Sequence, residues 1–418
     1  MSLADARALD QKDPLRSFRD EFVFPETKSG QAPMYFAGHS LGLMPKKAET
    51  YINQELKAWG KYGVEGHFEG EHPWLPYHEN ITGSFARLVG AKEEEVVAMN
   101  TLTVNLHLLM VSFYRPTKSR FKILIEANTF PSDKYAVDSQ ARFHGFDPRE
   151  AVVEIKPRAG EDHLREEDLL QKIQDLGESL CLVMLGNCNY LSGQCFPFQK
   201  ITEKAHSVGA VAGFNLAHGA GNLFLQLHDW KVDFAVWCSY KYLNAGPGGI
   251  AGAFVHQTHL NSKSLPRFEG WWGQNKSIRF KMGPDFDAIP TVEAWQLSNP
   301  PIFQLASLRA SMELFDKATM KGLREKGEKL TSYFENQIRT ELEGHVSIVT
   351  PPLPQRGSML CLRFKKSPRA WAGKLRERGA FVDFREPDII RATPAPLYNS
   401  HEDIYRLVQT FKEVMHES

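Results

Sequence analysis

The chain reads Trp237-Cys238-Ser239-Tyr240-Lys241-Tyr242-Leu243-Asn244-Ala245-Gly246-Pro247-Gly248-Gly249 in the stretch that decides its fold. The apolar run at 234–237 predicts a strand just before Lys241, and the glycines predict a tight turn just after it. A desolvated lysine at a strand end is what a pyridoxal phosphate (PLP) enzyme uses to hold its cofactor covalently. Lysines in such places more often reach for water, so Lys241 needs support from elsewhere in the chain.

That support begins at Phe214-Asn215-Leu216-Ala217-His218, where Asn215 lies 26 residues before Lys241. A PLP enzyme places here the side chain that faces the pyridine nitrogen of the cofactor. The side chain is normally an aspartate, and in this chain it is an asparagine.

Composition excludes several functional classes. Lys+Arg and Asp+Glu balance at 50 each, so the chain has no excess of positive charge that would indicate binding to nucleic acid or to an anionic membrane. No apolar run approaches the length of a membrane span, and the first thirty residues show no signal peptide. The five cysteines form no CxxC pair, and their odd number favours reduced thiols and a cytoplasmic location.

The middle of the chain predicts an α/β fold. Its length of 418 residues favours two domains. Continuous apolar runs separated by helix-sized intervals predict a mostly parallel sheet buried on both faces. The predicted strands lie at 122–126, 182–185, 210–214 and 234–237.

The C-terminal part has a different character. A helical pattern from about 303 to 342 predicts one long connector helix after Pro300-Pro301. Short strands at 359–364, 380–384 and 389–392, closed by a helix at about 401–415, predict a small α+β domain. We therefore expect three parts: a segment at 1–50 that contributes to the small domain and the active site, a large cofactor-binding domain at 51–310, and a small C-terminal domain at 311–418.

One motif favours a different class of enzyme. Gly38-His39-Ser40-Leu41-Gly42 fits the G-x-S-x-G nucleophile elbow and follows an apolar run, so a serine hydrolase that uses Ser40 is an alternative. Fewer than forty residues precede Ser40, which is too few for the strands and the oxyanion loop that belong upstream of an elbow. The hydrolase is the less favoured hypothesis.

Two further signals are weak. The run at 246–251 matches G-x-G-x-x-A in letters, but 250–255 reads as a strand, whereas the dinucleotide fingerprint must open a helix. His67, His72 and His78 have no carboxylate at ligand spacing in the sequence, and His256-x-x-His259 stands alone. We expect no metal site.

The PLP hypothesis makes two more demands, and the chain meets both. A phosphate requires N–H groups and hydroxyls at a helix N-terminus, and Asn100-Thr101-Leu102-Thr103 precedes an apolar helical run. The pyridine ring requires an aromatic cover, and Phe130-Pro131-Ser132-Asp133 offers one directly after a strand, followed by a carboxylate.

Taken in order, these segments resemble the kynureninase family of PLP-dependent hydrolases, which has fold type I (aspartate aminotransferase-like, class V). The resemblance runs from Gly38 to Ser400. Its marks are G-x-S-L-G-L at 38–43, L-T-V-N-L at 102–106, F-P-S-D at 130–133, L-A-H at 216–218, S-Y-K-Y-L-N-A-G at 239–246, G-W-W-G at 270–273, S-N-P-P at 298–301 and I-R-A-T-P-A-P-L-Y-N-S at 390–400.

The resemblance implies hydrolysis of the Cβ–Cγ bond of L-kynurenine or 3-hydroxy-L-kynurenine, which yields L-alanine and anthranilate or 3-hydroxyanthranilate. That reaction belongs to tryptophan catabolism, on the kynurenine pathway to NAD. It also implies a homodimer with shared active sites and a small aromatic amino acid as substrate.

By match to the family motifs, Lys241 would hold PLP and move protons, with help from Tyr240. Arg391 would clamp the substrate carboxylate, and Ser40, His67 and Asn299 would line the aromatic end of the substrate site. His67 with Asn299 resembles the form that favours 3-hydroxykynurenine. The cofactor would contact Leu102, Thr103, Phe130, Pro131, Ser132, Asp133, Gly186, Asn215, His218, Tyr240 and Lys241, with Trp271 and Asn299 supplied by the partner subunit.

Three residues depart from the family pattern. Asn215 replaces an aspartate, and because an amide brings no negative charge, the protonated state of the ring nitrogen loses support. Asp133 would partly compensate if its carboxylate reaches the same region. His39 replaces an asparagine, and Gly186 stands where a serine or threonine is usual. These departures leave two further hypotheses beside a kynureninase: a related PLP enzyme with another substrate, and a PLP protein with impaired catalysis.

Overall fold

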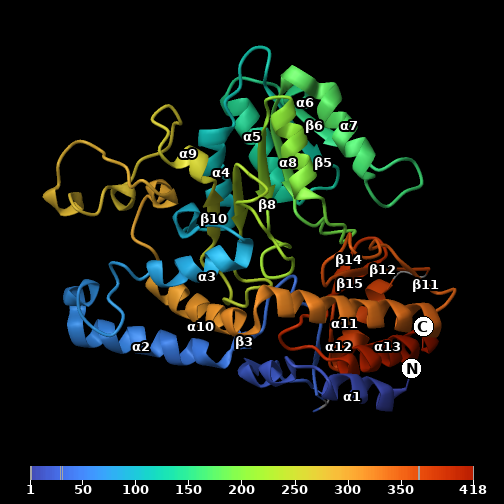
Figure 1. The fold of residues 1–418 in the computed structure, drawn as a ribbon. Coiled ribbons are helices and arrows are strands. Elements are labelled where there is room, and N and C mark those ends of the chain that lie inside the picture. Colours follow the sequence, from blue (N-terminus) through green and yellow to red (C-terminus); the bar gives the residue numbers. More distant parts are fainter. Residues whose placement is uncertain (1, 29, 31, 366–367, 418) are drawn as a thin grey trace.

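The structure is a computed structural model that describes residues 2–28, 30, 32–365 and 368–417 (Figure 1). A central sheet of seven strands has the order β4-β10-β9-β8-β7-β5-β6. The strands from β9 to β6 in this order are mutually parallel, and β10 runs antiparallel to both of its neighbours. The sheet consists of β4 Val96–Ala98, β5 Lys122–Glu126, β6 Val152–Ile155, β7 Leu180–Gly186, β8 Val211–Asn215, β9 Phe234–Trp237 and β10 Gly252–Val255.

The expected mostly parallel sheet is thus confirmed, and its burial explains the continuous apolar runs. Successive residues of β5 and β7 belong alternately to two hydrophobic cores, one on each face: Leu124 and Val183 on one side, Ile123 and Leu182 on the other. Because both faces are covered, neither can be polar. The helices of this part are α3 Glu79–Val89, α4 Leu102–Phe113, α5 Pro131–Phe143, α6 Pro148–Ala151, α7 Glu166–Leu176, α8 Phe198–Ser207 and α9 Gln257–Leu260.

A smaller α+β unit follows, as the sequence predicts. Its sheet has the order β11-β12-β15-β14, and one face of it packs on α11 and α13 through a separate hydrophobic core. The elements are α11 Met320–Glu341, β11 Val346–Ile348, β12 Leu360–Phe364, α12 Trp371–Glu377, β13 Ala380–Phe381, β14 Asp383–Arg385, β15 Ile389–Ala392 and α13 His401–His416. The strand predicted at 380–384 is two strands, because β13 pairs with β2 (Met34–Tyr35) whereas β14 pairs with β15.

The single connector helix predicted at 303–342 is also wrong. The segment forms two helices, α10 (Ile302–Ala318) and α11, which Figure 1 shows running across the molecule in orange. They are separated by Thr319, whose φ of 59° lies in the left-handed region. Its hydroxyl accepts a hydrogen bond from the backbone of Gly322 and so caps α11. Neither glycine nor proline marks the break, so the helical pattern runs through it.

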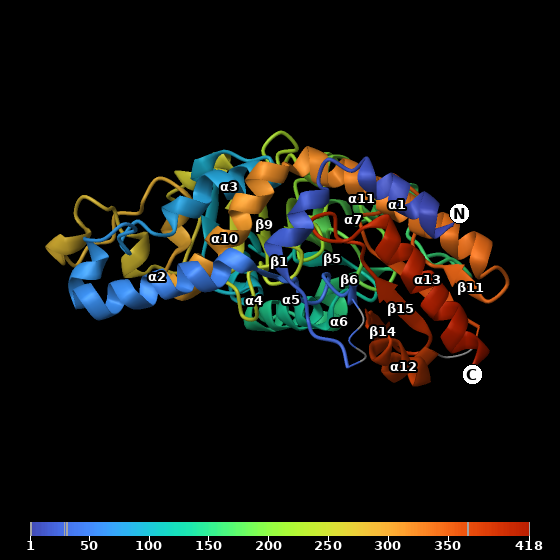
Figure 2. The same ribbon diagram turned by 90° about the horizontal axis from the view of Figure 1, so that it is seen from below.

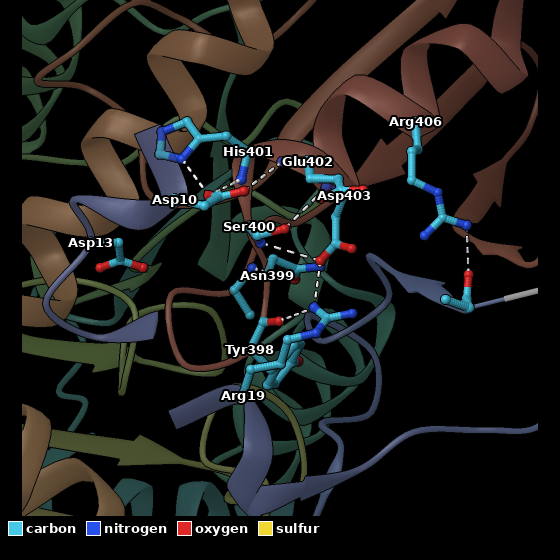
Figure 3. Close-up of polar contacts among 12 residues, drawn as sticks. Asp10, Asp13, Arg19, Tyr398, Asn399, Ser400, His401, Glu402, Asp403 and Arg406 are labelled. Atoms are coloured by element: carbon cyan, nitrogen blue, oxygen red, sulfur yellow. Dashed lines mark hydrogen bonds and ion pairs between the residues drawn. The ribbon is translucent and has the colours of Figure 1, made fainter. Parts of the chain in front are cut away.

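The N-terminal segment lies against the C-terminal helix (Figure 2). Helix α1 (Leu3–Gln11) packs on α13, and the side chain of Asp10 accepts hydrogen bonds from the first backbone N–H groups of α13, at His401 (2.7 Å) and Glu402 (3.0 Å). Arg19 donates to the buried Asp403 at 2.6 Å and to the carbonyl of Tyr398 (Figure 3). These contacts hold residues 10–19 on the small unit.

The remaining N-terminal elements lead toward the large sheet. They are β1 Phe22–Val23, which pairs with β3 Met44–Pro45, and α2 Lys46–Tyr62, which lies beside α10 (Figure 1). Among the helices of the described ranges, none has the length and apolarity needed to cross a bilayer. The parallel arrangement brings the carboxyl ends of β5, β7, β8 and β9 to one edge of the sheet, at Glu126, Gly186, Asn215 and Trp237.

Candidate active site

Lys241 lies just beyond the carboxyl end of β9, as the sequence predicts. Its Nζ atom is 3.3 Å from Nε2 of His218 and 5.7 Å from the ring centre of Phe130. Burial lowers the pKa of Lys241, and the positive charge of Arg391 acts in the same direction. A lowered pKa makes the neutral amine easier to reach, and the neutral amine is the form that attacks a carbonyl carbon.

The N-terminal segment closes one side of this lysine. The backbone N–H of Gly42 donates to the carbonyl of Tyr240 at 2.8 Å. A Cβ atom at position 42 would lie 2.4 Å from the carbonyl oxygen of Lys241, so only glycine permits this approach. The G-x-S-x-G run thus acts as a close packing segment.

The serine hydrolase hypothesis finds no support in this geometry. Ser40 lies in a turn after the short strand β2, which pairs with β13 and is not part of the large sheet. An elbow serine instead stands between a strand of the main sheet and a helix. Ser40 is exposed, and among the described residues no hydrogen bond joins its hydroxyl to a histidine.

Asn215 and Asp133 form a buried pair at the sheet edge. The Nδ2 atom of Asn215 donates to Oδ2 of Asp133 at 2.7 Å, and Oδ1 of Asn215 accepts from the backbone N–H of Ala217 at 2.8 Å. The second carboxyl oxygen of Asp133 has no hydrogen-bond partner among the described residues. Burial raises the pKa of Asp133 to about 6, against the opposing effects of Asn215 and Lys241. A buried, under-satisfied carboxyl of this kind suits a cationic nitrogen.

The N-termini of two helices meet near this pair. Thr103 lies in the first turn of α4, and Ser132 lies in the first turn of α5, where Pro131 occupies the first helical position. Their hydroxyl oxygens are 2.9 Å apart. Leu102 begins α4, and no side chain caps its free N–H groups. Two helix N-termini with two hydroxyls are a suitable site for a phosphate group.

Gly186 is explained by a neighbour that the sequence analysis missed. Glu126, at the end of β5, accepts two hydrogen bonds from the backbone N–H of Gly186, each of 3.2 Å. A Cβ atom at 186 would lie 2.8 Å from Oε1 of Glu126, so the carboxyl fills the space of a side chain there. Burial raises the pKa of Glu126 to about 7, and the charge of Asp133 adds to the effect.

Arg391 lies on β15 and faces the same region from the small unit. Its Nη1 atom donates to the carbonyl of Tyr190 at 2.9 Å, and its Nη2 atom donates to Asp383. The ring of Tyr190 contacts the ring of Phe130, with centroids 5.4 Å apart. Asp383 and Tyr190 are functional neighbours that the sequence did not indicate, because no pattern in a single sequence shows that either residue contacts Arg391.

Three of the predicted site residues lie elsewhere. His67 contacts Phe68 and Trp74, and Trp271 contacts Phe280, which in turn contacts Phe68. Asn299 lines a separate hollow of about 290 Å³ together with Thr101 and Gly248. Within the described ranges, no hydrogen bond, ion pair or ring contact joins any of the three to Lys241 of the same chain.

The expectation of reduced thiols is wrong for two of the five cysteines. Cys188 and Cys195 form a disulfide at the base of the loop that carries Tyr190, whereas Cys181, Cys238 and Cys361 are free and buried. The spacing of seven residues has no CxxC signature. The loop turns back on itself, and the turn brings the two sulfurs together.

Two clusters of metal-ligating side chains do occur. His78 has no carboxylate at ligand spacing in the sequence, but in the structure its Nε2 atom lies 3.0 Å from Oε2 of Glu293. The ammonium of Lys276 already bridges Glu293 and Glu79. In the other cluster Glu95 accepts two backbone N–H groups, and His228 stacks on His256, with rings 12° from parallel. Both ring nitrogens of His256 already have partners, the hydroxyl of Thr258 and the carbonyl of His228. The absence of a metal stays a prediction.

Known proteins are similar to this chain in both sequence and fold. Residues 323–411 match the family model described as "Kynureninase C-terminal domain". A curated kynureninase of Myxococcus xanthus is 60% identical over 97% of this chain and 96% of its own length. The cysteine desulfurase CsdA of Escherichia coli superposes with a TM-score of 0.78 at 18% identity, covering 96% of this chain and 98% of its own. A structure named C-DES, with glycine covalently linked to its PLP cofactor, gives 0.75 at 16% identity, covering 92% and 98%. The expected fold type I is confirmed.

Proposed function

The chain belongs to the kynureninase family, and on that premise we propose that it hydrolyses L-kynurenine or 3-hydroxy-L-kynurenine. The products are L-alanine and anthranilate or 3-hydroxyanthranilate, and the pathway is tryptophan catabolism toward NAD. The observation that carries the proposal is the half-buried Lys241 beside His218, Phe130 and the Asn215–Asp133 pair, in a chain so similar to a curated kynureninase.

The cofactor of the family is PLP, and the residues of the site fit it. Lys241 would hold it covalently. Thr103, Ser132 and the N–H groups of α4 and α5 would bind its phosphate, and Asp133 with Asn215 would face its ring nitrogen. When bound, PLP accepts the electron pairs that the substrate releases at Cα and Cβ.

Lys241 is suited to proton transfer because its environment favours the neutral amine. Burial and the nearby positive charges lower the pKa of His218 well below its usual range, so its imidazole is neutral. The Nε2 atom of this neutral ring and Nζ of Lys241 are within hydrogen-bond distance at 3.3 Å, and the contact orients the amine. Tyr240 stands next to Lys241 in the chain, and we propose that it assists the transfers.

The substrate would lie between Lys241 and Arg391. The planar guanidinium of Arg391 suits a bidentate contact with the α-carboxylate. Ser40, His67 and Asn299 would surround the aromatic ring, and we propose a preference for the 3-hydroxylated substrate. Equal kcat/KM values for the two substrates would refute that preference.

We also propose a homodimer in which each chain completes the site of the other. Three exposed aromatic side chains, Phe68, Phe280 and Trp271, contact one another in a row, and we call them the aromatic surface. Such a surface is unusual on a monomer. It contains Trp271 and lies next to His67, and both belong to the predicted site but have no contact with Lys241 of their own chain.

Mixed dimers test this arrangement. Lys241→Ala and Trp271→Ala chains are mixed, unfolded and refolded together. If Trp271 acts across the interface, one site of each mixed dimer has both an intact lysine and an intact tryptophan, so activity returns. If Trp271 acts within its own chain, every site stays defective and the mixture is as inactive as its components.

We further propose the organisation into a segment at 1–50, a large domain at 51–310 and a small domain at 311–418, together with a cytoplasmic location. The separate cores support the division, and the three free cysteines fit the location. Limited proteolysis and cell fractionation test the two.

The activity itself is tested in two steps. The protein with PLP should show a visible absorption band that Lys241→Ala abolishes. Adding 3-hydroxykynurenine and following 3-hydroxyanthranilate then separates an active kynureninase from a protein that only binds the cofactor. A band without product would overturn the proposed reaction and leave the cofactor site standing.

A further inference from the structure

His39 occupies a buried position between Lys241 and the small unit. Its Nδ1 atom is 2.8 Å from the hydroxyl of Thr393, and its Nε2 atom is 3.3 Å from Oδ2 of Asp383. Burial lowers the pKa of His39 to about 4, and the positive charges of Arg391 and Lys241 act in the same direction. The ring is therefore neutral near pH 7 and carries a single N–H.

The neighbours of the ring decide which nitrogen carries that proton. A carboxylate accepts hydrogen bonds and cannot donate one, whereas a hydroxyl can do both. The favoured tautomer therefore accepts the hydroxyl proton of Thr393 at Nδ1 and carries its own proton on Nε2, which lies 3.3 Å from Oδ2 of Asp383 in a geometry that does not meet that of a hydrogen bond, so the attraction is electrostatic. In this state His39 ties the carboxylate of Asp383 to the strand end at Thr393.

Asp383 in turn fixes the guanidinium of Arg391. The same Oδ2 atom accepts from Nη2 of Arg391 and, at 3.1 Å, from Nη2 of Arg385. Nη1 of Arg391 is held by the carbonyl of Tyr190. The Nε atom of Arg391 is buried and has no partner among the described residues, so it remains available to a further acceptor.

We propose that His39 is a positioning residue for the substrate carboxylate: it orients Asp383, and Asp383 orients Arg391. This inference rests on the proposed function, because it assumes that Arg391 receives the α-carboxylate. His39 does not touch the reacting atoms. Its contribution is to the affinity for a carboxylate-bearing ligand.

Two amide side chains of different length can separate the two contacts of the ring. The amide of asparagine ends at the level of Nδ1, so it can reach Thr393 but falls short of Asp383. The amide of glutamine extends to the level of Nε2 and can donate to Asp383. His39→Asn therefore can keep only the contact with Thr393, whereas His39→Gln can keep the contact with Asp383.

The experiment measures steady-state kinetics and ligand binding in the enzyme with PLP. We expect His39→Asn to raise KM about fivefold or more while kcat changes less than twofold, and His39→Gln to stay near the parent enzyme in KM. Two inert ligands provide the second readout by calorimetry: 3-benzoylpropionate, which has a carboxylate, and butyrophenone, which has a methyl group instead. Only the first should bind more weakly to His39→Asn.

Three results would overturn the proposal: an unchanged KM in His39→Asn, an equal loss of affinity for both ligands, or an effect of His39→Gln as large as that of His39→Asn. Thr393→Val is a second variant if His39→Asn does not fold. It keeps the volume, removes the anchor of Nδ1, and should weaken the same ligand. Calorimetry does not depend on turnover, so absent turnover in the parent enzyme would count against the proposed function alone.

Discussion

Asn215→Asp tests the pairing of a neutral amide with the buried carboxyl of Asp133. In the cofactor-free protein the substitution removes the 2.7 Å hydrogen bond to the carboxyl of Asp133. It also places two carboxyls in contact. At a separation of about 4 Å and an effective dielectric constant near 20, two ionised carboxylates repel by about 4 kcal/mol.

The pair relieves this repulsion by sharing a proton. The pKa of Asp133 is already raised to about 6, so taking up a proton at pH 7.5 costs about 2 kcal/mol. We therefore expect the cofactor-free variant to be about 2–4 kcal/mol less stable than the parent protein at pH 7.5. The loss should shrink toward pH 5, where the shared proton is bound without cost.

With PLP bound, the sign of the effect reverses. A second carboxylate stabilises a protonated ring nitrogen, and each pKa unit gained there corresponds to about 1.4 kcal/mol. We expect tighter cofactor binding and a kcat several times higher than in the parent enzyme. Urea unfolding without cofactor, a cofactor titration and steady-state kinetics measure the three effects.

The double variant Asp133→Asn/Asn215→Asp is the matched control. It moves the single carboxylate across the hydrogen bond without changing the net charge, so it should retain activity where Asp133→Asn alone loses most of it. An unchanged or lower kcat in Asn215→Asp would refute the reasoning. So would an unchanged stability of its cofactor-free form.

Three further substitutions test the surroundings of the site. Glu126→Gln should stabilise the cofactor-free protein by about 3 kcal/mol at pH 8.5 and by less than about 1 kcal/mol at pH 5, because the pKa of Glu126 is raised from 4.5 to about 7 and its stabilising contribution is lost as the pH rises through that range. Urea unfolding at both pH values checks this, and an equal gain at both would contradict it. Gly186→Ser should cost about 1–3 kcal/mol by overpacking against Glu126, seen as a lower Tm, and a Tm equal to that of the parent would show that the carboxyl can move aside. Arg19→Ala should cost about 3 kcal/mol by stranding the buried Asp403, whereas Arg7→Ala, which breaks an exposed pair with Glu402, should cost less than about 1 kcal/mol by the same measurement. Similar losses for the two arginines would contradict the assignment.

The sheet could be predicted from the sequence because each buried strand carries its own signal. The run at 234–237 is apolar throughout and the run at 122–126 is apolar at 123–125, and they form β9 and β5 with the predicted bounds. Residues next to these strands could be placed for the same reason, since Asn215 and Lys241 follow strands that end at one edge. Thr319 could not be predicted, because its left-handed backbone carries no residue signal.

Contacts between distant parts of the chain were the second gap. His39 and Asp383 are 344 positions apart, and nothing in either local pattern indicates that they meet. The same holds for Glu126 and Gly186. The sequence suggested that a hydroxyl is absent at position 186, whereas in the structure the carboxyl of Glu126 occupies the space that a side chain there would need. The disulfide depends on a loop shape that no cysteine spacing foretold.

The contacts of Asp10 and Arg19 with the last helix have a consequence for the order of events during synthesis (Figure 3). The N-terminal segment is synthesised long before its partner at residues 398–403. The large sheet can assemble while the chain grows, but Gly42 cannot be held against Lys241 by an anchored segment until residues 398–403 have been made. In a nascent chain stalled before α13, the segment around Gly42 would therefore not be held over Lys241. Any reaction at Lys241 in that state would be exposed to water.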